Sequence, residues 1–194
     1  MTKAAGRENR ASPPGLRTRE VRDRALFDLE DGPVTPSNQG DLAAMARLLN
    51  ALLASLIVSS LQYEQHTQLV RAPSVRPLRD FLSLCADRDR GGAGLLATRI
   101  RQLGFAGEYD PEQLSARSRI AFRTFPDGEV ESVVTQNLVG ARILVQTMQE
   151  AVRWIGDDDP TTRRLLERLL ADKEAEADEL SAQCLPQRSS PTVH

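Results

Sequence analysis

Apolar residues recur at steps of three and four in four long stretches of the chain, the spacing that places side chains along one face of an α-helix. The first helix is expected to begin at the capping residues Ser37 or Asn38. The last follows Asp159 and Pro160, which suit the cap and the first helical position. We therefore predict four long helices, over residues 38–70, 75–103, 129–155 and 159–183.

A long connection, residues 105–128, separates the second predicted helix from the third. Asp110 is a suitable cap for a short helix within it, over Pro111–Phe122. Two helices, a long crossover and two further helices are the plan of a ferritin-like four-helix bundle. The predicted fold is therefore all-α, with one bundle domain over residues 37–183 and a short C-terminal tail over 184–194.

The first 36 residues contain no helical stripe, and Pro13, Pro14 and Gly15 interrupt them. Such a segment cannot bury enough apolar surface to offset the entropy of ordering it, so we predict a flexible tail over residues 1–36. The tail is basic over residues 1–24, where seven basic residues face only three acidic ones.

Composition narrows the class of protein. Hydrophobic residues make up 40% of the chain and aromatic residues only 4%, which favours helix-on-helix packing over a β-sandwich. The net charge of −2 gives the whole molecule no strong attraction to nucleic acid or to an anionic membrane. Cys85 and Cys184 form no motif, and the longest apolar run, residues 48–61, is broken by polar residues. We expect a cytoplasmic protein without a membrane partner.

Three segments carry a family resemblance: Gln136–Ile143, Trp154–Glu167 and Leu170–Leu180. They resemble the bacterioferritin and Dps branch of the ferritin-like superfamily, and the resemblance extends roughly over residues 40–182. It implies a bundle centre in which two helices each supply a carboxylate and two others each supply Glu-x-x-His to a pair of irons. By this resemblance the ligand positions fall on Leu56, Asp89, Gly92, Ala141, Lys173 and Glu176.

These six positions depart from the family pattern. Leu56, Gly92 and Ala141 have no ligand atom, and Lys173 places a cation where a metal would bind. Asp89 and Glu176 are only weak candidates, because two carboxylates are too few for two irons. We therefore expect no cofactor, no catalytic residue and no enzyme activity.

A second metal site of the branch lies between Dps subunits, and by resemblance its ligands fall on Thr67, Ser83 and Asp87. His66 is one residue out of place, which turns its side chain by about 100° on a helix. His66 is thus a weak metal candidate, and a partly buried polar pair with Tyr63 is the simpler interpretation. The haem-binding methionine of bacterioferritin would fall at Arg90.

Two inward positions leave alternatives open. Lys173 either extends its amine to solvent or pairs with Asp89 or Glu176 inside the bundle. Gly92 marks a close helix approach, a kink or a relaxed former ligand site. Cys85 is most simply a small core residue.

Three functions are consistent with these residues. The first is a non-catalytic structural or binding subunit of an oligomer, either homomeric (dimer-based, up to a shell) or mixed with an active paralogue. Its expected contact surface is the outer faces of the first two helices, with Leu48, Leu53, Ile57 and Leu84. The second is a Dps-type DNA-binding protein, and the third is an iron-storage ferroxidase with a rebuilt site.

The DNA-binding hypothesis rests on the charge of the N-terminal tail. If phosphates bind there, deleting residues 1–24 should abolish the gel shift of duplex DNA while leaving the helical circular dichroism unchanged. Binding by the full chain should weaken steeply with salt. Retention of DNA by the truncated protein at moderate salt would contradict the hypothesis. The candidate phosphate contacts are Lys3, Arg7, Arg10, Arg17 and Arg19.

Overall fold

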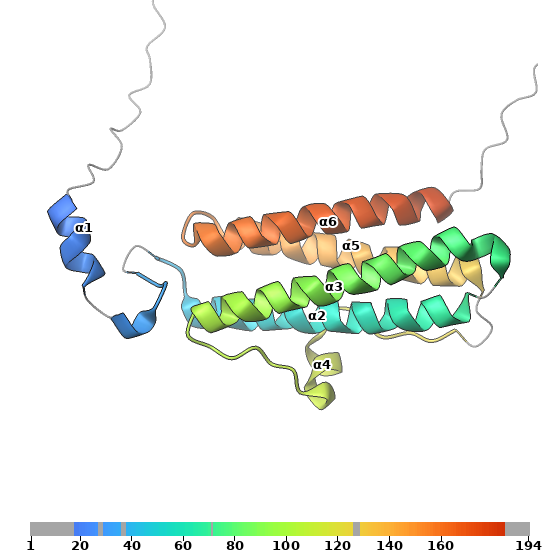
Figure 1. Cartoon of the computed structure of the whole chain (residues 1–194), viewed down its shortest axis with the longest axis horizontal. Helices are drawn as coiled ribbons and strands as arrows, with labels where there is room; N and C mark the ends of the chain where they lie inside the picture. The colour runs from blue at the N-terminus through green and yellow to red at the C-terminus, as the bar shows by residue number, and fades with distance from the viewer. Residues whose placement is uncertain (1–17, 27–28, 36–37, 71, 126–128, 185–194) are drawn as a thin grey trace, which may run out of the picture.

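The computed structural model describes residues 18–26, 29–35, 38–70, 72–125 and 129–184, and all regular structure within these ranges is helical. Four long helices lie side by side (Figure 1). The predicted all-α bundle with a long crossover is confirmed, and the predicted helix bounds hold to within about four residues. The four helices are α2 (Leu42–Leu69), α3 (Arg76–Gln102), α5 (Val130–Ile155) and α6 (Pro160–Cys184).

The helix ends follow local hydrogen bonding. The side chain of Asp41 accepts a 2.9 Å bond from the amide of Ala44 and caps α2. The cap expected at Ser37 or Asn38 is therefore too early, and Asn38 instead accepts a bond from the amide of Gly40 in the lead-in segment. Gly156, with φ of +53°, ends α5 in a conformation that side chains rarely adopt.

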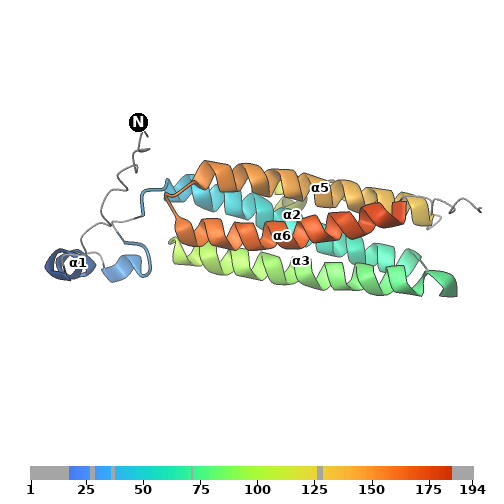
Figure 2. The ribbon, with the colours of Figure 1, turned by 90° about the horizontal axis from the view of Figure 1, so that it is seen from above.

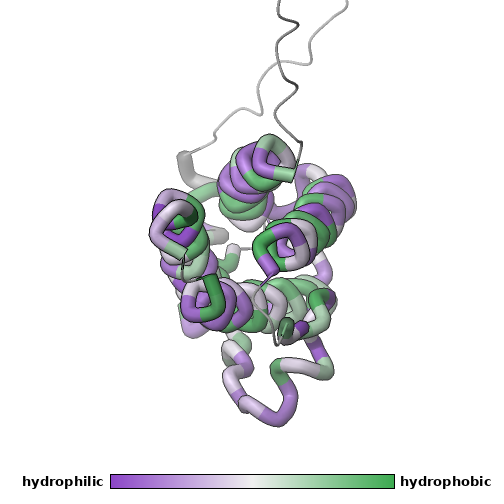
Figure 3. Tube along the Cα trace, turned by 90° about the vertical axis from the view of Figure 1, so that its right-hand side faces the viewer, coloured by the Kyte–Doolittle hydropathy of each residue, from purple (hydrophilic) through white to green (hydrophobic). Residues whose placement is uncertain are grey.

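The bundle consists of two helical hairpins. Helix α2 packs along α3 and α5 along α6, and the hairpins meet through α2 against α5 and α3 against α6 (Figure 2). A single-turn 3-10 helix, η2 (Pro73–Val75), connects the first pair. Seen along the bundle, the four helices surround a common centre, and the crossover runs outside them (Figure 3).

The crossover is hydrogen-bonded to polar side chains of α2. It contains α4 (Pro111–Arg117), which Asp110 caps as predicted, although α4 ends before the expected Phe122. Three α2 side chains bond its backbone: Asn50 bonds Ala106 O at 3.2 Å and Glu108 N at 2.9 Å, Ser55 bonds Arg119 N at 2.8 Å, and Gln62 bonds Arg123 N at 2.9 Å.

Helix α2 is the most apolar of the long helices, which raises the question of whether it could cross a membrane. Contrary to the prediction that no run is long enough, α2 has the length and mean hydropathy to cross a bilayer. However, 61% of its most apolar window is buried inside the molecule, as in the core helix of a water-soluble bundle. Its apolar character is thus accounted for by neighbours on several sides, including the crossover.

The surface predicted to contact other subunits, on the outer faces of α2 and α3, is partly buried within the chain. Leu53 is fully buried, so its assignment to the exposed outer face of α2 is wrong. Leu48 and Ile57 are half-buried against the core, whereas Leu84 on α3 is 45% exposed. An amphipathic helix is expected to bury one face and expose the other, but a helix that packs against neighbours on most sides also buries apolar residues of its outer face.

The N-terminal region contains two short elements within the range predicted to be a tail: α1 (Thr18–Ala25) and η1 (Leu29–Asp31). Both lie beyond the end of the bundle (Figures 1 and 2). The chain joins the bundle at Val34, which packs against the core. Residues 1–17, which hold most of the basic segment, lie outside the described residues. So do residues 185–194, which are nearly all of the predicted C-terminal tail.

Candidate functional site

Three charged residues meet at the centre of the bundle, where α3 faces α6. Asp89 lies on α3, and Lys173 and Glu176 lie one turn apart on α6. They are only 1%, 3% and 2% exposed. Burial of charge is expensive unless it is paired, so the bonds within this cluster decide its stability.

Lys173 is the centre of the cluster. Its Nζ donates to both carboxylate oxygens of Glu176, at 2.7 and 2.9 Å, and pairs with Oδ1 of Asp89. The alternative in which the amine extends to solvent is therefore wrong, and the internal pairing is found with both candidate carboxylates.

A third helix closes the cluster. The hydroxyl of Tyr63, on α2, donates a 2.5 Å bond to Oε1 of Glu176. The Tyr63 ring centroid lies 5.5 Å from Lys173 Nζ, within range of a cation–π attraction. Helices α2, α3 and α6 are thereby joined through one ammonium group and its neighbours.

The cluster holds two carboxyl groups and one ammonium group, and burial is the largest influence on their pKa values. Burial raises the pKa of Asp89 to about 6, Lys173 opposes the rise, and Glu176 adds to it. Burial by itself would lower the pKa of Lys173, but Asp89 and Glu176 outweigh it and raise that pKa. Burial and the two carboxylates raise the pKa of Tyr63. One oxygen of Asp89, Oδ2, has no hydrogen-bond partner among the described residues.

Gly92 lies beside the cluster in a close helix approach, the first of its three alternatives. A Cβ at Gly92 would lie 3.2 Å from Cδ1 of Leu56 and 3.2 Å from Cδ2 of Leu169. A side chain there would force one of these leucines to move. Gly92 and Leu56 line a cavity of about 20 Å³ together with all three charged residues. Ala141 is buried nearby in the cluster of apolar residues that includes Tyr63.

Five of the six positions assigned by resemblance thus converge on one cavity, but their side chains do not fit a pair of irons. Leu56, Gly92 and Ala141 supply no ligand atom, and the Nζ of Lys173 lies between the two carboxylates. Across the residues that the structure describes, no three His, Cys, Asp or Glu side chains group in a way that could hold a metal.

His66 is completely buried rather than partly so. Its Nδ1 bonds Oδ1 of Asn137, on α5, at 3.0 Å, while its Nε2 has no partner in the described chain. Burial lowers its pKa, outweighing the hydrogen bond with Asn137. His66 and Tyr63 do not form the expected pair, because each bonds a helix of the other hairpin.

The positions assigned by resemblance to the second metal site lie on two helices of the chain, α2 and α3. Thr67 donates to the carbonyl of Tyr63 at 2.8 Å. Ser83 and Asp87 are exposed on α3, whereas His66 is fully buried and is therefore not available to a site between subunits.

Cys85 is a buried core residue, as expected, and burial raises the pKa of its thiol. Among the candidate DNA contacts, Lys3, Arg7, Arg10 and Arg17 lie outside the described residues, and Arg19 lies on α1.

A second buried ion pair was not predicted from the sequence. Arg99, on α3, bonds Asp159 Oδ2 at 2.7 Å and Thr162 Oγ1 at 2.8 Å. Asp159 also accepts from the amides of Thr161 and Thr162 and so caps α6. Burial would raise the pKa of Asp159, but the bonds from Thr162 and Arg99 lower it. In the sequence, this ion pair could have been suspected from the position of Arg99 on the inward-facing stripe of its helix.

A four-helix bundle with one long crossover connection is the architecture of the ferritin-like class of protein. The family model of the ferritin-like domain matches residues 46–185. The chain therefore belongs to the ferritin-like domain family. No curated protein matches the sequence.

Solved structures show the same fold at low sequence identity. Antigen TpF1 from Treponema pallidum has a TM-score of 0.74 and 16% identity, covering 79% of this chain and 100% of its own. The bacterioferritin-related protein from Bacteroides fragilis, a dodecameric thioferritin, has a TM-score of 0.71 and 22% identity, with coverage of 74% and 86%. DpsC from Streptomyces coelicolor has a TM-score of 0.67 and 22% identity, with coverage of 77% and 86%.

Replacing Lys173 by Met tests the role of the buried amine. The substitution keeps the length of the side chain but leaves the carboxyl groups of Asp89 and Glu176 without a cation. The free energy of unfolding should fall by about 3–5 kcal/mol. Urea denaturation at pH 8 measures this loss, and the combined variant Lys173→Met, Asp89→Asn, Glu176→Gln should recover most of it. A loss below about 1 kcal/mol would contradict the pairing.

Replacing Asp89 by Asn tests whether the pKa of the Asp89 carboxyl group is raised in the folded protein. The native state holds a proton on Asp89 up to pH about 6, whereas the unfolded chain releases it near pH 3.8. Between these values Asp89 makes the free energy of unfolding fall as pH rises, by about 3 kcal/mol at most. Asp89→Asn should remove this fall, so its stability relative to the wild type should increase from pH 4 to pH 7.

Urea denaturation across that pH range measures the difference between the two proteins. Asp178→Asn, which neutralises an exposed carboxyl group on α6, is the matched control and should follow the wild type. A constant difference between Asp89→Asn and the wild type would contradict the raised pKa.

Proposed function

We propose that this protein is a non-catalytic member of the ferritin-like family, a structural or binding subunit of an oligomer. The observation that carries the proposal is the position of Lys173 Nζ, which is bonded to Glu176 and paired with Asp89 at the bundle centre. A covalently attached cation there performs the charge-balancing role that a metal performs in a di-iron bundle.

Electrostatics opposes metal binding at this place. A metal ion 4 Å from an ammonium group meets repulsion of about 4 kcal/mol per unit charge at an effective dielectric constant near 20. The carboxylates that would attract the ion are already bonded to Lys173, so binding would also break those bonds. Oxidation of two irons together requires both to be held by shared carboxylates, and Leu56 and Ala141 offer none.

The assembly part of the proposal draws on the relatives. The Bacteroides fragilis protein is dodecameric, and its fold covers 74% of this chain. We infer that the present chain associates with copies of itself, or with an active paralogue, through a related bundle surface. Leu84 and Leu95, which are 45% and 41% exposed on α3, are apolar residues that such contacts would cover.

The proposal predicts the response to ferrous iron. Anaerobic protein mixed with two Fe(II) per chain and then with oxygenated buffer should consume oxygen no faster than buffer with iron alone. Stopped-flow absorbance of ferric products and an oxygen electrode measure this rate. The wild type should also leave the visible spectrum of added Co(II) unchanged, which reports binding separately from oxidation.

A variant carrying the ligands that the family resemblance implies provides the positive comparison. It combines Leu56→Glu, Asp89→Glu, Gly92→His, Ala141→Glu, Lys173→Glu and Glu176→His. Circular dichroism checks its fold, and the Co(II) spectrum checks its binding. Oxidation of two irons per wild-type chain within seconds would overturn the proposal and favour the rebuilt ferroxidase. The DNA-binding alternative is independent of this outcome, since it rests on the tail.

A further inference from the structure

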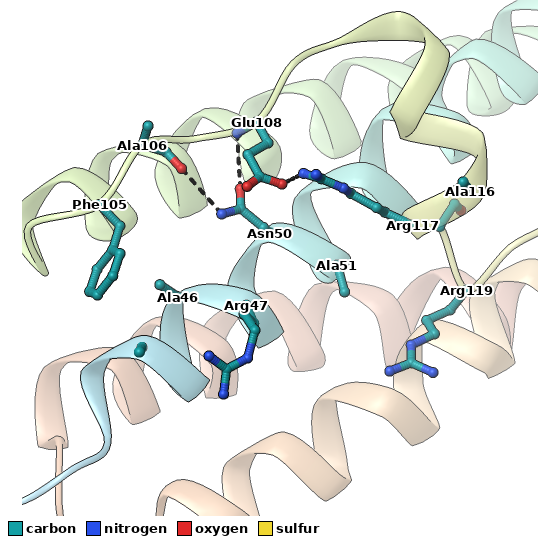
Figure 4. Close-up of a pocket in the computed structure, with 12 residues that line it drawn as sticks. Ala46, Arg47, Asn50, Ala51, Phe105, Ala106, Glu108, Ala116, Arg117 and Arg119 are labelled. Carbon is teal, nitrogen blue, oxygen red and sulfur yellow. Dashed lines mark hydrogen bonds and ion pairs between the residues drawn. The ribbon is translucent and has the colours of Figure 1, made fainter.

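A hollow of about 670 Å³ lies between the first turns of α2 and the crossover. The α2 side of the hollow includes three small residues, Ala43, Ala46 and Ala51. Phe105, whose side chain is 40% exposed, forms one edge (Figure 4). We call this hollow the crossover groove. Its floor is apolar and uncovered within the single chain.

Two arginines give the crossover groove a positive rim. Arg47 extends from α2 and Arg119 from the crossover, and neither guanidinium group bonds another described residue (Figure 4). By contrast, Arg117 pairs with Glu108, and Asn50 is bonded to the crossover backbone. Free guanidinium groups beside an apolar floor suit a peptide that carries both carboxylates and apolar side chains.

The chain itself contains such a peptide. Residues 25–31 read Ala-Leu-Phe-Asp-Leu-Glu-Asp, which combines apolar and acidic residues without a basic one. Leu26 and Leu29 are 63% and 70% exposed, and the structure shows no cover for them. This segment, which we call the acidic arm, therefore combines apolar side chains that suit the floor of the crossover groove with carboxylates that suit its positive rim.

We propose that the acidic arm of a second copy of this chain occupies the crossover groove, with Glu30 against Arg47 and Arg119. The proposal rests on the assembly part of the proposed function and names the segment that makes the contact.

The exit of the arm from the bundle favours a second copy over the arm's own groove. Val34 holds the chain against the core, and Gly32 then turns it with φ of +60°, next to Pro33. Proline fixes its own φ, so the direction of exit is restricted. The described residues of the arm accordingly lie beyond the end of the bundle at which the crossover begins, outside the groove of their own chain (Figures 1 and 2).

Cross-linking between distinguishable chains tests the contact. One chain carries Glu30→Cys and a large solubility tag, and the other carries Ala43→Cys without the tag. Both carry Cys184→Ser, while Cys85 is buried and unreactive. A short bismaleimide should join one tagged chain to one untagged chain. Asp178→Cys in place of Ala43→Cys, on the exposed face of α6, is the matched control and should not cross-link.

A single chain carrying both Glu30→Cys and Ala43→Cys separates the two possible occupants. If the double variant links only within itself and the mixed chains do not link, the arm fills its own groove and the proposal is overturned. Absence of any link in both experiments overturns it as well.

Charge exchange supplies a second readout on the full chain. Arg47→Glu and Glu30→Arg should each weaken self-association about tenfold in sedimentation velocity, and the two together should restore it. Asp178→Arg should leave association unchanged. Association that is insensitive to both single variants would overturn the arm contact while leaving the proposed oligomer intact. A protein that stays monomeric at high concentration would instead remove the assembly proposal itself.

Discussion

The fold depends on how two helical hairpins are held together at their shared face. Each hairpin buries apolar residues along its own length, but the contact between hairpins includes polar bonds at several levels of the bundle. Lys173 joins α6 to α3, Tyr63 joins α2 to α6, and His66 joins α2 to α5. Arg99 joins α3 to the start of α6.

Polar links of this kind fix register more strictly than apolar packing does. Leucines that slide by one turn find similar surroundings, whereas an ammonium group that leaves its carboxylates is left buried without a partner. The penalty for a shifted pairing is therefore several kcal/mol at the two ion pairs, and about 1–3 kcal/mol at the hydrogen bonds of Tyr63 and His66. The Lys173 cluster at the bundle centre is one of these links, so the same requirement for paired charges fixes the register of the helices around it.

The long helices were predictable because each has a clear apolar stripe and a clear stop. The inward orientation of Asp89 and Lys173 also followed from that periodicity, whereas Glu176 was assigned through the family resemblance. Sequence alone could not choose between a snorkelling and a paired Lys173, because the choice depends on which residue faces it across the bundle.

The failures have a common cause in long-range contacts. Leu53 was assigned to the surface because nothing in its own helix shows that other parts of the chain bury that face. Asn50 and Ser55 looked like interruptions of an apolar run until their partners, more than 50 residues away, were known. The cap of α2 was misplaced because Asn38 and Asp41 are equally suitable by residue type.

The contact between Gly92 and Leu56 restricts the order in which substitutions can accumulate at the bundle centre. A larger residue at position 92 collides with Leu56 and Leu169 as long as those side chains keep their present size. A chain that first shortens position 56 relieves one of these two contacts, whereas enlarging residue 92 first passes through an intermediate overpacked against both leucines and less stable by about 1–3 kcal/mol. The two positions are thus epistatic, and mutational routes that enlarge residue 92 are expected to begin on α2.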